Sequence, residues 1–133
     1  MKALPVKKPE LLAPAGKEDV FLAAVEAGAD AVYLAGKSFN MRRHRNDFNF
    51  TSAALERSVR FGHARNCKIY VTVNTLVGPT EVDGLRDYLV YLGEIGVDAL
   101  IVQDLAVVLL LILLPRDRTA DGRVLHVYLC GCA

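Results

Sequence analysis

Amide and carboxylate side chains follow two apolar runs of this sequence, where strands are expected to end. Asn74 comes directly after the run at 68–73, and Gln103 and Asp104 follow the run at 99–102. An amide both donates and accepts hydrogen bonds, and a carboxylate can act as a general base. Such side chains also cap the loop or helix that follows a strand. We predict Asp104 and Asn74 as candidate catalytic residues and Gln103 as a candidate substrate-binding residue.

The concentrated positive charge of the chain lies in a polar stretch at 37–49. Arg42, Arg43, His44 and Arg45 follow one another there. Guanidinium groups match the oxygens of carboxylates and phosphates, so this stretch suits an acidic substrate or an RNA backbone. A solvated loop is the alternative, and it is the ordinary interpretation for Arg43 and Arg45. We predict Arg42 and Arg43 as substrate-binding residues, whereas no partner for His44 can be identified.

The apolar patterns around these residues alternate between the periods of strands and helices. Strands are predicted at 10–13, 30–34, 68–73 and 99–102, and helices at about 17–28, 52–65 and 79–96. This alternation indicates parallel strands joined by right-handed crossovers, in an open doubly wound sheet or a closed eight-fold barrel. The first turn, PAGK at 14–17, lacks the glycine-rich phosphate cradle of nucleotide-binding sheets. In a barrel, functional side chains gather at the carboxyl ends of the strands.

Residues at helical spacing are expected to form the core, with Cys67 as a small buried residue and Tyr33 packed inside. The predicted core residues of the three helices are Val20, Phe21, Ala24 and Val25, then Leu55, Val59 and Phe61 or Gly62, then Val82, Leu85, Leu89 and Leu92.

Composition bounds the class of protein. The 133 residues fit one domain, with 53% hydrophobic and 23% charged residues and a net charge of +1, so no overall field attracts nucleic acid or a membrane. The apolar run at 105–114 is shorter than the roughly 20 residues of a membrane span. The N-terminus lacks a signal sequence, so we expect a cytoplasmic protein. Cys130 and Cys132 have no neighbouring ligands that would indicate a metal site.

Several motifs together resemble one family. They are ELLAPAG at 10–16, GADAVYL at 28–34, Phe39 and Arg42 with 46–50, YVTVN at 70–74 and GVDALIVQD at 96–104. In this order and spacing they resemble the collagenase-like peptidase family, number thirty-two of the unassigned "U" peptidases. The resemblance covers 9–104, after a short N-terminal extension at 1–8.

This resemblance implies the N-terminal half of a parallel β/α barrel of the TIM type, with about four strands, in a longer protein. Some members are peptidases, and others help to hydroxylate RNA bases or quinone precursors with an iron–sulfur cluster held by downstream cysteines. We therefore expect no cofactor in this segment and a peptide or RNA substrate. A half-barrel that binds RNA or an acidic ligand without catalysis is the alternative. No nucleophile–base motif such as H-E-x-x-H or G-x-S-x-G is present.

The stretch at 105–133 departs from the family pattern. Its first part is almost wholly apolar, and its end lacks the expected strand. Our hypothesis is that a reading-frame slip in the gene produced this stretch. Resequencing the gene past the stop codon tests it, and the hypothesis is refuted if no other frame encodes family sequence there. A half-barrel leaves two strand edges unpaired, so we expect the fragment to associate with itself. Because it holds only part of the barrel, we also expect it to be inactive alone.

Overall fold

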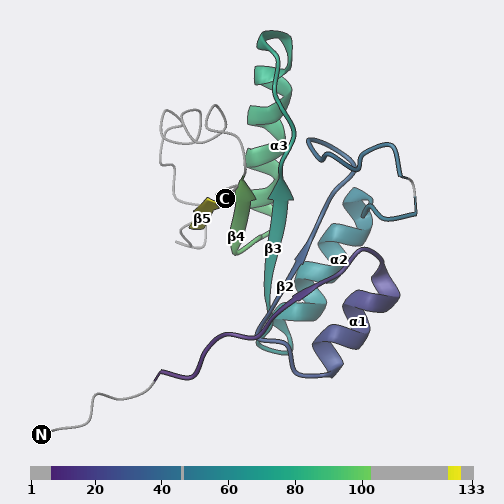
Figure 1. Cartoon of the computed structure of the whole chain (residues 1–133), viewed down its shortest axis with the longest axis vertical. Coiled ribbons are helices and arrows are strands. Elements are labelled where there is room, and N and C mark those ends of the chain that lie inside the picture. The colour runs from purple at the N-terminus through teal and green to yellow at the C-terminus, as the bar shows by residue number, and fades with distance from the viewer. Residues whose placement is uncertain (1–6, 46, 103–125, 130–133) are drawn as a thin grey trace, which may run out of the picture.

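The computed structural model describes residues 7–45, 47–102 and 126–129, which form one sheet of five parallel strands with helices packed beside it (Figure 1). The strands are β1 (Leu12–Pro14), β2 (Ala31–Leu34), β3 (Lys68–Val73), β4 (Ala99–Val102) and β5 (His126–Leu129). The helices are α1 (Glu18–Glu26), α2 (Ser52–His63) and α3 (Val82–Glu94), and a 3-10 turn, η1 (Pro79–Glu81), leads into α3.

The order of the strands decides between the two architectures that the sequence leaves open. Neighbours in the sheet are neighbours in the chain, from β1 to β5, and every pair is parallel. A doubly wound sheet reverses its strand order at a switch point, whereas the wall of a barrel continues in one direction. The expected class, part of a parallel β/α barrel, is therefore confirmed.

The two faces of the sheet carry different side chains, because successive residues of a strand point to opposite sides. Val32, Ile69, Val71 and Leu100 belong to the large core between strands and helices and are fully buried. The helices contribute mainly Phe21, Val25, Leu55, Val59, Leu85, Leu89 and Leu92 to this core. The other face, which lines the inside of a barrel, holds a smaller cluster of Ala31, Tyr70 and Ala99, with Tyr33 and Ile101 against it.

Most sequence predictions for the core are confirmed, but Val20 and Val82 are not among the buried core residues. Cys67 is buried, Gly62 is buried, and Phe61 packs against the same core. Val20 is 45% exposed, because it lies on the solvent side of α1, whereas Phe21 and Val25 face the core. Tyr33 is partly buried, as expected for a packed residue, and it contacts the smaller cluster on the face of the sheet that is turned away from the helices.

Strand β5 was not predicted from the sequence. It lies in the stretch expected to diverge from the family, and it pairs in parallel with β4, with His126 opposite Ala99. The predicted strands at 68–73 and 99–102 agree with β3 and β4, while β1 begins two positions later than the predicted run. Within the described residues, no helix is long and apolar enough to cross a membrane.

The amino ends of the strands are closed by polar contacts. The Tyr70 hydroxyl donates a hydrogen bond of 2.6 Å to one carboxylate oxygen of Glu10, and the Lys68 ammonium lies 2.9 Å from the other. The bond from Tyr70, followed by that from Lys68, lowers the pKa of Glu10. Asp30 accepts a hydrogen bond from the Leu11 N–H at 2.8 Å. These contacts stabilise the fold, which is the usual role of the amino face of a barrel.

Candidate functional site

A pocket of about 210 Å³ opens at the carboxyl ends of β1, β2 and β3. This is the end of a parallel β/α barrel at which active sites are found. One side of the pocket is formed by Asn40, Arg42, Phe48 and Asn49, which lie between β2 and α2. The lining residues are Pro14, Ala15, Gly16, Tyr33, Leu34, Ala35, Asn40, Arg42, Phe48, Asn49, Thr72 and Asn74.

Two of the predicted site residues, Asn74 and Arg42, line this same pocket although they are far apart in the sequence. The side-chain oxygen of Asn74 accepts a hydrogen bond of 3.0 Å from the Met41 N–H, and its backbone N–H donates to the Phe39 carbonyl at 3.2 Å. Asn74 therefore ties the loop to the end of β3, which is the capping role considered as its alternative. Its substrate-positioning role stays a prediction.

Arg43 does not line the pocket. Its guanidinium lies 3.8 Å from the carboxylate of Glu81, and both side chains are more than two-fifths exposed, so the pair contributes little to stability. Arg45 lies over the ring of Phe48 at 4.4 Å from its centroid. Gln103 and Asp104 lie outside the described residues.

Sequence reasoning missed several residues of the site. Asn40 is only 3% exposed, and its amide group donates to the Gly36 carbonyl at 3.3 Å and to the Asn49 side chain. Phe48 and Tyr33 supply aromatic rings to the pocket lining. The match of 46–50 to the family pattern is the one signal in the sequence that points to Phe48 and Asn49. No signal points to Asn40, because an asparagine buried in a polar loop cannot be recognised from its neighbours in the sequence.

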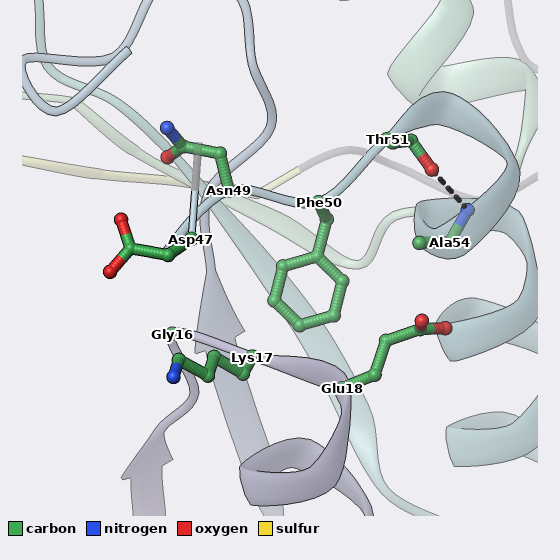
Figure 2. A pocket seen from close by; sticks show the side chains of 8 residues that line it. All are labelled: Gly16, Lys17, Glu18, Asp47, Asn49, Phe50, Thr51 and Ala54. Carbon is green, nitrogen blue, oxygen red and sulfur yellow. Dashed lines mark hydrogen bonds between the residues drawn. The ribbon is translucent and has the colours of Figure 1, made fainter. Parts of the chain in front are cut away.

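A second hollow of about 270 Å³ adjoins the first, outside the strands and between the beginnings of α1 and α2 (Figure 2). Figure 2 shows the ring of Phe50 among charged side chains of both signs, Lys17, Glu18 and Asp47. Thr51 lies at its rim and accepts the hydrogen bond of the Ala54 N–H at 3.2 Å. This second hollow is larger than the first pocket. It is nevertheless the weaker candidate for a functional site, because its charges are of both signs and it lies outside the barrel.

The described residues do not fit a metal or iron–sulfur site. No group of three His, Cys, Asp or Glu side chains gathers within the described ranges. Cys67 is buried on the helix side of the sheet, and burial raises the pKa of its thiol. A buried thiol of raised pKa is a poor source of the thiolate that binds metals.

A parallel β/α sheet with a pocket at its carboxyl edge defines part of a barrel-type domain. The model of peptidase family U32 matches residues 16–115, so the chain belongs to this family. The fold resembles the solved structure of the U32 peptidase Mk0906 with a TM-score of 0.70 and 16% identity, over 98% of this chain and 51% of that one.

Relatives of known name have different activities. The chain is 43% identical over 103 residues to tRNA hydroxylation protein P1 of Bacillus subtilis, covering 77% of this chain and 24% of that protein. It is 38% identical to a 23S rRNA 5-hydroxycytidine synthase of Escherichia coli, over 74% of this chain and 14% of that one. It is 32% identical to a collagenase of Porphyromonas gingivalis, over 73% and 23%. The chain thus spans about a quarter or less of these relatives.

Proposed function

We propose that this chain supplies the substrate-binding mouth of an RNA-modifying enzyme of family U32 and does not catalyse a reaction alone. The observation that carries the proposal is that Arg42 shares one pocket with the amide side chain of Asn74, at the carboxyl ends of the strands. A guanidinium binds phosphate oxygens, and amide side chains suit the donor and acceptor groups of nucleobases. The names of the tRNA and rRNA relatives favour the same class of substrate.

The size and aromatic content of the pocket also support a polymer ligand. Its volume of about 210 Å³ is below the roughly 300–1,000 Å³ of pockets that enclose a whole drug-sized molecule, so it suits one unit of a longer chain. The rings of Tyr33 and Phe48 offer surfaces on which an unstacked base can lie.

The expected lack of activity in isolation rests on the types of residue that line the pocket. No carboxylate, histidine or cysteine is among the described lining residues, and Thr72 donates its hydroxyl hydrogen to the Leu34 carbonyl at 3.3 Å. Such a lining can bind and orient a ligand, but it offers no evident proton acceptor. Asp104 remains our candidate for a general base, with Gln103 beside it in the sequence.

Peptide hydrolysis is the second candidate, favoured by the family description and by the collagenase relative. An acidic peptide would use the same guanidinium, that of Arg42, as an RNA phosphate. Release of labelled fragments from gelatin by the purified chain would support this candidate over the first.

The test measures binding of a fluorescein-labelled single-stranded RNA oligonucleotide to the full chain by anisotropy at several salt concentrations. Arg42→Ala should weaken binding and reduce the salt slope by about 0.7, the value for one contact to a single-stranded phosphate. Arg57→Ala is the matched control, because it removes the same charge from α2, where Arg57 pairs with Glu18 at 2.9 Å. The proposal would be overturned if the two variants bound the RNA with equal affinity, or if the wild-type chain bound an acidic peptide as tightly as it binds the RNA.

A further inference from the structure

The loop that carries Arg42 is held by the side chains of three asparagines. Asn40, Asn49 and Asn74 come from the beginning of the loop, from its end and from the end of β3. Each makes at least one hydrogen bond to the backbone of the segment at 39–45. This segment belongs to no strand of the described sheet, so side-chain amides provide restraints that a ladder of backbone bonds would give elsewhere.

Arg42 is restrained on both sides of its α-carbon. Its N–H donates to the side-chain oxygen of Asn40 at 3.0 Å, and its carbonyl accepts from the side-chain nitrogen of Asn49 at 2.7 Å. Asn40 also donates to the side-chain oxygen of Asn49, so the two amides form one connected unit. The same nitrogen of Asn49 donates to the Arg45 carbonyl at 2.8 Å.

The neighbouring residues are fixed in the same way. The N–H of Met41 donates to Asn74, while Phe39 adopts a left-handed backbone conformation with φ of 52° and accepts from the Asn74 N–H. A left-handed conformation is uncommon for a bulky residue and needs support from its surroundings. Asn40 is almost fully buried, so losing its partners would leave polar atoms unsatisfied.

We propose that Asn40, Asn49 and Asn74 are positioning residues that hold the backbone of Arg42 at the mouth of the pocket. Because a guanidinium gains more from an anion when its geometry is set in advance, these amides contribute to affinity through Arg42. This role rests on the proposed function, in which Arg42 contacts the ligand, whereas the restraint of the loop does not.

The restraint is tested without any ligand, by limited trypsin digestion of the full chain with mass analysis of the products. Asn49 donates to the carbonyls of Arg42 and Arg45, which belong to two of the three peptide bonds after arginine that trypsin would attack in this segment. Asn49→Ala should speed cleavage at both bonds by about tenfold, since each lost hydrogen bond is worth a factor of several. Thr51→Ala, which removes the cap of α2 but no contact of Arg42, is the control and should leave these rates near wild type.

The positioning role is tested by RNA binding in a double-mutant cycle. Asn49→Ala should weaken binding several-fold, yet add no further loss when Arg42→Ala is already present. A variant that loses affinity only because it is partly unfolded would show an equal loss in both backgrounds. Asn74→Asp keeps the oxygen that accepts from Met41 and should cleave more slowly than Asn74→Ala.

The outcomes separate the two ideas. Unchanged trypsin rates for Asn49→Ala would overturn the restraint itself, whatever RNA does. Faster cleavage together with additive losses of affinity would overturn the positioning role. Faster cleavage with no RNA binding by any form, wild type included, would overturn the proposed function and with it the positioning role, while it would support the restraint of the loop.

Discussion

Replacing Gly36 by alanine tests how closely α3 packs against the end of β2. A Cβ atom on Gly36 would lie within 3.0 Å of the Tyr88 hydroxyl oxygen, and 3.3 Å from a methyl group of Leu55. Overpacking of this kind costs about 1–3 kcal/mol of the free energy of unfolding. The φ angle of Gly36 is not positive, so the cost arises from the contact and not from backbone strain.

The hydroxyl of Tyr88 makes the prediction sharper. It is buried without a hydrogen-bond partner among the described residues, and burial raises the pKa of Tyr88, so the group stays neutral. Tyr88→Phe should stabilise the fold by about 1 kcal/mol, because it removes an unsatisfied polar group and little else. It also removes the atom that the new methyl group would meet, so Gly36→Ala should cost less than about 1 kcal/mol in that background.

Urea denaturation followed by far-ultraviolet circular dichroism measures this cycle, since the chain contains no tryptophan and tyrosine fluorescence would itself change with Tyr88→Phe. Gly78→Ala is the control, because its Cβ would meet only the Glu81 carboxylate at 3.5 Å. It should be neutral or slightly stabilising in both backgrounds. An equal cost of Gly36→Ala with and without the hydroxyl would refute the reasoning.

Three further predictions follow from the packing and the charges. Gly62→Ala in α2, normally favourable in a helix, should destabilise in urea titrations, because its Cβ would lie 2.7 Å from a methyl group of Ile69; a gain in stability would contradict the packing. Because folding lowers the pKa of Glu10, its contribution to stability is present above the unfolded pKa near 4.5 and is lost as the pH falls through the folded pKa. Glu10→Gln should therefore lower the melting temperature at pH 7 more than at pH 3. An equal decrease at both pH values would contradict this prediction. The chain should elute as an oligomer in size-exclusion chromatography, since β1 is paired on one side only within the described sheet, and a sharp monomer peak would exclude this.

The sequence determines the elements of this protein. Alternation of apolar runs with helical spacing predicted β3 and β4 at their observed bounds and the buried faces of α2 and α3. These signals are local, because a strand or helix records in its own residues which side meets the core. The carboxyl-end rule led from the sequence to Asn74, and the cluster of positive charge led to Arg42; the two residues line one pocket.

Only the tertiary structure decides how these elements combine. The monotonic strand order, which distinguishes a barrel wall from a doubly wound sheet, depends on crossovers that leave no mark in any single segment. The pairing of β5 with β4 and the bonds of Asn40 and Asn49 to Arg42 likewise form between residues whose neighbours in the sequence do not identify them. Periodicity reports whether a residue is buried, but a hydrogen bond depends on which group folding brings within about 3 Å of it.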